Sequence, residues 1–515
     1  MLAGYPEQLA RPLIDGFTVG FRIPSSLAHN PDKKGYTNHK SVSDSPKVVQ
    51  DKLAKELQLG RISGPYLRPP LDKFVCSPLG LVPKKEPGQF RLIHDLSFPK
   101  NNSVNSHIDP ANATVQFEML DTCIAHVVHI GPGCLMAKAD LKDAFRIIPI
   151  APIDYHLLGF VFNGQFYFDK CLPMGCSVSC SLFEALSQAL QWVLTSNMGV
   201  DRMSHILDDF IFFGQPGSSQ AHHGLHQFFQ LCSRLGLPVK HEKTIQPTTK
   251  AQLHGILVDS QSMMLQLPPD KLSDLRAKLQ ALARRKKATL KDLQSLIGSL
   301  NFACRVIVPG RAFCRRLIDL TVGHSKPDHR IRLSSEARKD IAAWLSFLQN
   351  FNGSALCLPN DWLSSQVLAL HTDASGFAFA ALLGDSWFNG KFPPGWLPYH
   401  IAVKELLPIV LALQVWTDRF ANRRVLFLCD NEAVVQVIND QTSRCPQLMS
   451  LIRQLVIHTM AHNIHFKAKH LPGVHNVVAD ALSRFQLNRA RNLQPSLATR
   501  PDDLPSHWLP WLTEV

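Results

Sequence analysis

The sequence predicts a multidomain α+β protein whose C-terminal part is an α/β domain. Its 515 residues exceed the usual size of a single domain, so several domains are expected. Up to about residue 330, strand-like and helix-like segments follow one another without a regular order. After that point, apolar strands alternate with amphipathic helices, a pattern typical of a mixed sheet covered by helices.

The composition favours a polyanionic partner. Lysine and arginine exceed aspartate and glutamate by 54 − 41 = 13, and the pI is about 9.2. Such an excess is typical of nucleic-acid-binding proteins, although a generally basic surface would also produce it. The basic residues cluster at 284–287 and again at Arg305, Arg311, Arg315 and Arg316. This clustering favours nucleic acid as the partner.

The cysteines and the apolar runs indicate an intracellular protein, cytoplasmic or nuclear. The twelve cysteines are scattered and include no CxxC pair, which favours reduced thiols over disulfides or zinc sites. No apolar run reaches membrane-spanning length, and the first residues, MLAGYPEQLARPLIDG, lack a signal-peptide core. We therefore expect no membrane association.

The first two thirds of the chain contain recognisable strand and helix signals. Residues 1–50 become polar toward their end, and we expect an extension with little core of its own. The segment DKLAKELQLG (51–60) has helical spacing and a glycine stop, and FNGQFYF (162–168) is typical of a hairpin with an Asn-Gly turn. The other expected elements are strands within 74–98, at 134–145 and at 253–260, helices at 181–194 and near 221–235, and a largely helical region at 270–320.

The α/β pattern occupies residues 331–485. The expected strands are 366–373, 376–384, 423–430 and 463–471, and the expected helices are 404–420, 432–441 and 476–485. Residues 486–515 are rich in proline and polar residues, so we expect an irregular C-terminal tail.

One group of aspartates points to metal chemistry. The segment HILDDFIFFG (205–214) places Asp208 and Asp209 within an apolar run, where unpaired carboxylates are costly. A two-residue turn of a β-hairpin would also explain them. A further aspartate, Asp140, ends the strand in KADLKDAFR, although it and the following Asp143 could serve only as turn or cap residues.

Together, these aspartates could hold two hard cations against a triphosphate. Carboxylate oxygens suit Mg²⁺, with Mn²⁺ an alternative, and two such ions can activate a hydroxyl and neutralise a leaving pyrophosphate. Successive residues of a strand face opposite sides, so Asp208 and Asp209 should not be equal ligands. We expect Asp140 and Asp208 to be the principal ligands and Asp209 the secondary one.

The order of the motifs resembles that of reverse transcriptases over roughly residues 50–485. Five segments carry the resemblance, in chain order: SPLGLVPKKEPGQFRLIHDLS, KADLKDAF, LPMGCSVSCSLFE, ILDDFIFFG and LHGILVD. Three phrases look particularly like the polymerase of DIRS-like retrotransposons, which is paired with a tyrosine recombinase: GRISGPY, CLPMGCSVSC and IGSLNFACRVIVPGRAF.

The resemblance implies a right-hand polymerase. It places fingers and palm at 51–262 and thumb or connection at 263–330, and its catalytic carboxylates correspond to Asp140, Asp208 and Asp209. The basic run in the thumb would touch the phosphates of the bound nucleic acid.

The resemblance also implies roles for residues around the nucleotide. Lys84 and Arg91 would grip its triphosphate, although both could be solvated surface charges. Phe145 would exclude a 2′-hydroxyl, unless it is only a core aromatic. Gly175 would let the backbone approach the nucleotide. Lys240 or Lys243 could protonate pyrophosphate. Many reverse transcriptases have Gln where this chain has Met174 and Tyr where it has Ile206.

A second group of acids resembles that of ribonuclease H. Asp373 ends a strand, Glu405 lies on a helix, Asp430 ends another strand and Asp480 lies on the last helix. Each could serve alone as a turn, cap or surface acid. Jointly they imply a five-stranded mixed sheet with helices and four acids around two Mg²⁺ ions. In the family, a histidine in the position of His470, in a flexible loop, assists proton transfer, and Asn476 would orient that loop.

The resemblance implies an RNA-directed DNA polymerase with a linked ribonuclease H. Its substrates would be an RNA template, a DNA primer, dNTPs and the RNA–DNA hybrid. The sequence has no DTG or DSG protease motif, zinc knuckle or recombinase module, so we expect a recombinase from another chain or a longer precursor. Two alternatives are a non-catalytic remnant that binds nucleic acid and a nuclease with an inactive polymerase, the latter suggested only by Ile206.

Overall fold

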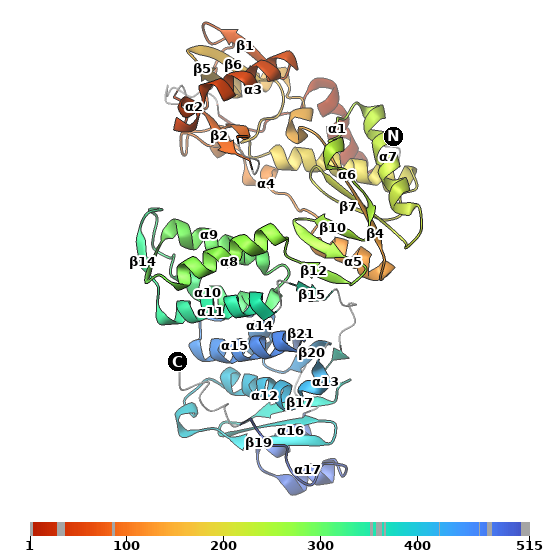
Figure 1. The fold of residues 1–515 in the computed structure, drawn as a ribbon, viewed down its shortest axis with the longest axis vertical. Helices are drawn as coiled ribbons and strands as arrows, with labels where there is room; N and C mark the ends of the chain where they lie inside the picture. Colours follow the sequence, from red (N-terminus) through yellow and green to blue (C-terminus); the bar gives the residue numbers. More distant parts are fainter. Residues whose placement is uncertain are drawn as a thin grey trace. The chain divides into compact units, whose positions relative to one another are not determined.

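The computed structural model divides into two compact units. The first comprises Met1–His254 with Asp259–Ser262, and the second comprises Gly255–Val258 with Met263–Val515. Figure 1 shows the chain from red at the N-terminus to blue at the C-terminus. The residues that the structure describes are 4–27, 37–84, 88–350, 354–356, 363–364, 367–421, 423–462, 464–470 and 476–505.

The N-terminal segment is part of the first unit's core. Helix α1 (Glu7–Val19) buries Leu13, and the chain after it buries Phe21 and Ile23 in the same apolar cluster as the central strands. Residues 1–50 were expected to be an extension with little core of its own. In the described part of this range, the apolar side chains of Leu13, Phe21 and Ile23 pack into the core of the first unit. Helices α2 (Lys40–Asp44) and α3 (Pro46–Gln58) follow, and α3 begins before the predicted residue 51 because Pro46 starts its first turn.

Five strands form two small sheets in the first unit, and α3 packs against both. They are β1 (Ile62–Tyr66), β2 (Leu79–Pro83), β3 (Phe90–His94), β5 (Gly159–Phe162) and β6 (Gln165–Asp169). The sheet orders are β1-β6-β5 and β2-β3, both antiparallel. The predicted Asn-Gly hairpin is confirmed: Asn163 and Gly164 both have positive φ between the paired residues Phe162 and Gln165.

The central sheet of the first unit has the order β7-β8-β4-β9. Its strands are β4 (Leu135–Asp140), β7 (Met203–Ile206), β8 (Asp209–Gly214) and β9 (Ile245–Thr248). Helices α6 (Ser179–Asn197) and α7 (Gln220–Leu235) pack against it, and Phe228 of α7 contacts Phe210 and Phe212 of β8. The other helices of this unit are η2 (Asn105–His107), α4 (Pro110–Ala113), α5 (Leu120–Ile130), η3 (Ala144–Ile147), η4 (Pro152–Leu157) and η5 (His241–Lys243).

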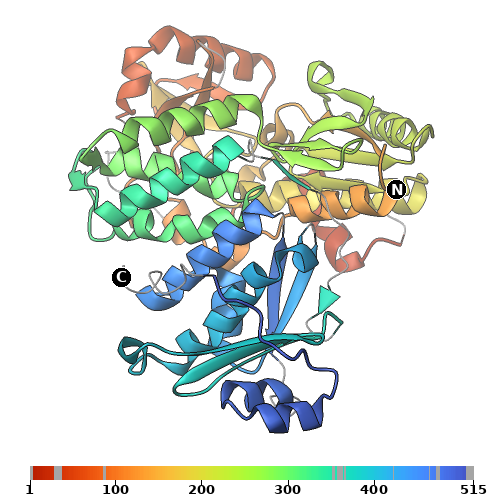
Figure 2. The same ribbon diagram turned by 60° about the horizontal axis from the view of Figure 1, so that its bottom comes forward.

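The strand predicted at 253–260 is interrupted by a turn. His254 and Gly255 both have positive φ, so the segment divides into β10 (Lys250–Leu253) and β11 (Ile256–Asp259). The region predicted to be largely helical, 270–320, is so, since it contains α8, α9, η6 and α10. Helices α8 and α9 lie side by side with the later helix α11 in both ribbon views (Figures 1 and 2). The elements after β11 are β12 (Met264–Gln266), α8 (Pro269–Ala283), β13 (Lys287–Thr289), α9 (Leu290–Ala303), η6 (Val308–Phe313), α10 (Arg315–Asp319), β14 (Arg330–Arg332), α11 (Ser335–Asn350) and β15 (Ser354–Leu356).

The rest of the second unit has two three-stranded ladders. Strands β17 (Leu370–Ala374), β18 (Ala378–Leu383) and β19 (Ser386–Lys391) are antiparallel. Strands β16 (Leu363–Ser364), β20 (Arg424–Cys429) and β21 (His465–His470) are parallel. The single five-stranded sheet that we expected is not formed by the described residues, among which β20 pairs with β16 and β21 but not with β17. The helices are η7 (Pro394–Trp396), α12 (Ile401–Val415), α13 (Thr417–Phe420), α14 (Glu432–Asp440), α15 (Pro446–Ala461), α16 (Val477–Ser483) and α17 (Leu487–Leu493).

The tail after residue 485 is not irregular throughout. Helix α17 lies within the predicted tail, and its buried Ala490 packs in one cluster with Leu482 of α16 and Trp387 of β19. A contact far away in sequence therefore orders a segment whose composition predicts a loop. In the described part of the chain, no helix is both long and apolar enough to span a membrane.

The aromatic contact between α7 and the central sheet generates a stability prediction. We expect Phe228→Ala to destabilise the first unit by about 3–5 kcal/mol, because it leaves a cavity beneath β8. Urea unfolding followed by hydrogen exchange in peptides of the central sheet measures this. The matched control is Leu235→Ala at the end of the same helix, where the side chain is 43% exposed. Equal losses for the two variants would contradict the proposed core role of Phe228.

Candidate active sites

The first carboxylate site is assembled by strand register. The antiparallel pairing of β4 with β8 places Asp140 directly opposite Asp209. The pairing of β7 with β8 places Ile206 opposite Asp209, so that Leu207 and Asp208 form the hairpin turn. The backbone carbonyl of Asp208 accepts a hydrogen bond from the amide of Leu141, 2.9 Å away. The predicted hairpin is thus confirmed, but its turn contains only Asp208 of the two aspartates, since Asp209 is the first residue of β8.

The carboxylates of Asp140 and Asp208 are in direct contact. Asp140 is buried, and burial together with the charges of Asp140 and Asp209 raises the pKa of Asp208 to about 7. A hydrogen bond between the side chains of Asp208 and Asp140 acts in the same direction. Asp209 instead binds the Nζ atom of Lys138 at 2.7 Å. The surplus negative charge of Asp140, Asp208 and Asp209 suits a divalent cation, and the order of ligands expected from the sequence stays a prediction.

Lysines surround these carboxylates. The Nζ atom of Lys243 lies 3.4 Å from Asp140, whereas burial and the neighbouring Lys243 lower the pKa of Lys240. Of the two lysines considered for proton transfer, Lys243 forms an ion pair with Asp140, and the backbone amide of Lys240 donates to the carbonyl of Asp140 at 2.8 Å. The ion pair of Lys138 with Asp209 was not predicted. The spacing in the sequence could have suggested it: Lys138 and Asp140 lie two residues apart on β4, so their side chains share a face of the sheet.

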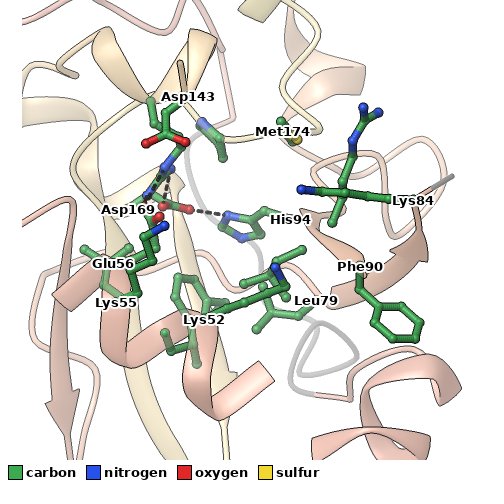
Figure 3. Close-up of a pocket in the computed structure, with 17 residues that line it drawn as sticks. Lys52, Lys55, Glu56, Leu79, Lys84, Phe90, His94, Asp143, Asp169 and Met174 are labelled. Atoms are coloured by element: carbon green, nitrogen blue, oxygen red, sulfur yellow. Dashed lines mark hydrogen bonds and ion pairs between the residues drawn. The ribbon is translucent and has the colours of Figure 1, made fainter. Parts of the chain in front are cut away.

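A pocket of about 230 Å³ in the first unit collects the residues expected to bind the nucleotide. Lys84, Arg91 and Met174 line it, together with Lys52 and Lys55 of α3 (Figure 3). Burial, and then the charges of Lys84 and Lys55, lower the pKa of Lys52. This crowding of positive charge suits an anionic ligand such as a triphosphate.

The acids along this pocket are neutralised by protein groups. Arg146 binds Asp169 at 2.7 Å and Glu56 at 2.9 Å, and His94 binds Asp169 at 2.9 Å. Burial opposes the charges of both Arg146 and Asp169. Their mutual attraction outweighs it, so that the pKa of Arg146 is raised and that of Asp169 is lowered. The sequence analysis did not find this buried cluster, because its members are far apart in the chain.

Gly175 and Phe145, also expected to lie near the nucleotide, are sequence neighbours of the pocket residues Met174 and Arg146. Gly175 has φ +127°, and a Cβ atom there would lie 2.0 Å from the carbonyl oxygen of His94. Glycine is thus required here by its contact with the backbone of His94, in addition to the expected approach of the nucleotide. Phe145 lies in η3, half-buried, with its ring edge-to-face against Phe183 at 5.8 Å. It contributes to the core, as the alternative interpretation proposed.

The second carboxylate site gathers the four predicted acids of the second unit. Burial raises the pKa of Asp373, and the charges of Asp480 and Asp430 raise it further. Burial and the charges of Asp430 and Asp373 raise the pKa of Glu405 to about 7. The four acids therefore lie within electrostatic reach of one another, although they come from β17, α12, the end of β20 and α16.

Some oxygens of this site are available to a cation. The Oε2 atom of Glu405 is buried without a hydrogen-bond partner. Ligand atoms of Glu405, Cys429 and Asp430 lie within 4.8 Å of one another. Asp373 accepts a hydrogen bond from Ser483 at 2.5 Å, and Asp480 is bound by Arg484 at 2.6 Å. The donor set therefore fits a hard divalent cation centred on Glu405 and Asp430.

The position of His470 differs from the prediction. It was expected in a flexible loop, but it is the last residue of β21 and pairs in parallel register with Cys429. The parallel ladder with β20 extends to this residue, so strand pairing carries His470 alongside the residue before Asp430. The following residues 471–475 lie outside the described part of the chain. Asn476 donates a hydrogen bond to the carbonyl of Thr372, 2.6 Å away, next to Asp373.

The first unit matches a known family. Residues 82–257 match the family model described as reverse transcriptase (RNA-dependent DNA polymerase). The chain is 22% identical to the Tf2-3 and Tf2-4 transposon polyproteins of Schizosaccharomyces pombe (strain 972), over 79% of this chain and 29% of each relative. It thus spans less than a third of the length of these relatives. Residues 82–257 are therefore similar to reverse transcriptase domains, and the chain as a whole is similar to part of these transposon polyproteins.

The fold is similar to that of solved reverse transcriptases. The foamy viral protease-reverse transcriptase in complex with dsDNA has a TM-score of 0.52 and 17% identity, covering 87% of both chains. The same protein in complex with an RNA/DNA hybrid has a TM-score of 0.50 and 17% identity, covering 88% of this chain and 57% of the other. These likenesses extend the reverse transcriptase fold beyond the family match.

The raised pKa of Asp208 generates a prediction for the metal-free protein. Between an ordinary pKa of 3.8 and about 7, the folded protein holds a proton that the unfolded chain releases. The contribution of Asp208 to stability therefore falls as the pH rises through this window. In EDTA, we expect Asp208→Asn to be more stable than wild type at pH 8, by on the order of 1–3 kcal/mol, and less so at pH 5.

Urea unfolding at the two pH values measures this difference. Saturating Mg²⁺ should then stabilise the wild type by more than it stabilises Asp208→Asn, because both proteins keep the acids of the second unit but only the wild type retains the carboxylates of both Asp140 and Asp208. A stability difference that is the same at pH 5 and pH 8 would show that Asp208 is not held in a charged, desolvated cluster.

Proposed function

We propose that the chain is the RNA-directed DNA polymerase of a retroelement, with a ribonuclease H in its second unit that degrades the RNA strand of RNA–DNA hybrids. The observation that carries the proposal is the pairing of Asp140 and Asp208, within the domain that matches reverse transcriptases. The net charge of +13 supports nucleic acid as the partner.

The polymerase site would use the residues of the first unit in distinct roles. Asp140 and Asp208 would hold Mg²⁺ or Mn²⁺, and Asp209 would be the secondary ligand because Lys138 already binds it. The bound metal ions would supply activation of the primer hydroxyl and neutralisation of the leaving pyrophosphate. Lys84 and Arg91 would bind the triphosphate of the incoming dNTP. Lys243 would give a proton to pyrophosphate, which its ion pair with Asp140 supports.

The nuclease site would use the four acids of the second unit. Asp373, Glu405, Asp430 and Asp480 would hold the cations that activate water against a phosphodiester. The buried, unpartnered Oε2 atom of Glu405 supports this assignment, since protein groups leave it unsatisfied. His470 would accept or donate a proton from the end of β21. The two proposed activities would act in sequence, because copying an RNA template produces the RNA–DNA hybrid that the nuclease would cleave.

The subfamily and the partner belong to the same proposal. The phrases GRISGPY, CLPMGCSVSC and IGSLNFACRVIVPGRAF support a DIRS-like element, which would need a recombinase supplied by another chain or by a longer precursor. The two competing functions are a non-catalytic remnant and a nuclease with an inactive polymerase. All seven acids are present, and a decaying remnant would be expected to lose some of them.

Separation of the two activities tests the proposed function. We expect Asp208→Asn to abolish primer extension on an RNA template with a DNA primer, Mg²⁺ and dNTPs, and to leave hybrid cleavage intact. Asp430→Asn should do the reverse, because each variant removes a ligand from one site only. Hybrid cleavage without primer extension by the wild type would support a nuclease with an inactive polymerase. No activity in either assay would support a non-catalytic remnant.

The role that the resemblance implies for Phe145 generates a prediction about sugar selection. We expect Phe145→Ala to raise incorporation of ribonucleotides relative to deoxynucleotides by about 10–100-fold, because the ring no longer excludes the 2′-hydroxyl. Single-nucleotide extension with each substrate measures the ratio. The control is Phe17→Ala, at a position on α1 that is 41% exposed. An unchanged ratio with reduced stability would leave Phe145 as a core aromatic alone.

A further inference from the structure

The turn that carries Asp208 has an unfavourable backbone. Leu207, the first residue of the turn, has φ +52°, in the left-handed region that branched L residues avoid. This conformation costs roughly 1–2 kcal/mol for a residue other than glycine. Contacts from outside the hairpin are therefore needed to hold the turn in one conformation.

Helix α6 supplies these contacts through two side chains. The carboxylate Oε2 atom of Glu184 accepts a hydrogen bond from the amide of Leu207 at 3.2 Å. The hydroxyl of Ser187 donates to the carbonyl of Leu207 at 2.8 Å. Residues three apart on a helix lie on one face, so Glu184 and Ser187 reach the same peptide segment. Both backbone polar groups of Leu207 are thus bound by one helix.

Glu184 is itself fixed by a buried polar network. Its Oε1 atom lies 2.9 Å from the Nε2 atom of His205, and the other ring nitrogen of His205 contacts Gln191. Gln191 donates to Glu118 at 3.0 Å, and Glu118 accepts from Ser204 at 2.5 Å. Glu184 and His205 are 3% and 2% exposed. A carboxylate this deep is costly unless its partners are in place, so the network restricts Glu184 to one orientation.

We propose that Glu184 and Ser187 are positioning residues that hold the backbone of Leu207 and thereby keep Asp208 beside Asp140. The inference rests on the proposed polymerase function, since it concerns the placement of a catalytic carboxylate. Asp208 directly follows the bound residue, and its own carbonyl is bound by the amide of Leu141. The turn is thus held from α6 on one side and from the end of β4 on the other.

Kinetics of full-length variants test the proposal. We expect Ser187→Ala to lower kcat by about tenfold, with the KM for template–primer unchanged, because small displacements of a catalytic group cost this much. The Mg²⁺ concentration for half-maximal activity should rise several-fold. Glu184→Gln should retain most activity, because its amide can accept from Leu207 and donate to the other tautomer of His205. Ser260→Ala, which removes a buried hydroxyl bound to the carbonyl of Cys134, should leave kcat and the Mg²⁺ dependence unchanged.

Hydrogen exchange of the 203–214 hairpin provides a readout that needs no activity. Glu184→Leu should accelerate exchange there, since the amide of Leu207 loses its acceptor, whereas Glu184→Gln should not. Ser187→Ala and Glu184→Leu variants with wild-type hairpin exchange and wild-type Mg²⁺ dependence would overturn the proposal. A wild type that fails to extend primers would instead contradict the proposed function, and the exchange measurement would still decide whether α6 holds the turn.

Discussion

The pairing register of β4 with β8 is the constraint on which the first site depends. It places Asp140 opposite Asp209, and the two-residue turn before β8 then brings Asp208 against Asp140. Because side chains alternate along a strand, a shift of one residue would turn Asp140 to the other face. The apolar contacts of Phe210 and Phe212 with Phe228 fix this register from beneath, since the same shift would expose both rings. The core and the carboxylate site are therefore specified by one alignment.

The second unit brings its acids together in a different way. Asp373, Glu405, Asp430 and Asp480 come from separate elements, and no single register aligns them. Packing of α12 and α16 against β17 and β18 carries Glu405 and Asp480 toward the strand acids. In both sites burial, and then repulsion by the neighbouring carboxylates, raises the pKa values of Asp208 and Glu405 to about 7. In both units, a divalent cation would convert this repulsion into binding energy.

The sequence predicts the elements whose signals are local. The Asn163-Gly164 turn follows from the preference of type I′ turns for these residues, and the helices at 270–320 follow from their apolar spacing. The proximity of Asp140 to Asp208 and of Asp373 to Glu405, Asp430 and Asp480 was expected only from the order of the motifs along the chain, because each acid alone could serve as a turn, cap or surface residue. The failures involve contacts that are distant in sequence. These are the burial of Phe21 and Ile23, the order of α17, the pairing of β16 with β20, the salt bridges of Arg146 and the place of His470 on β21.

The central claim is that Asp140 and Asp208 share a divalent cation. Its most direct test is an anomalous-difference map at the manganese edge, from crystals of the full chain grown with Mn²⁺, template–primer and a non-hydrolysable dNTP. The account predicts a peak within coordination distance of carboxylate oxygens from both Asp140 and Asp208. A map without a peak between these two residues, or with manganese bound by Asp209 alone, would contradict it.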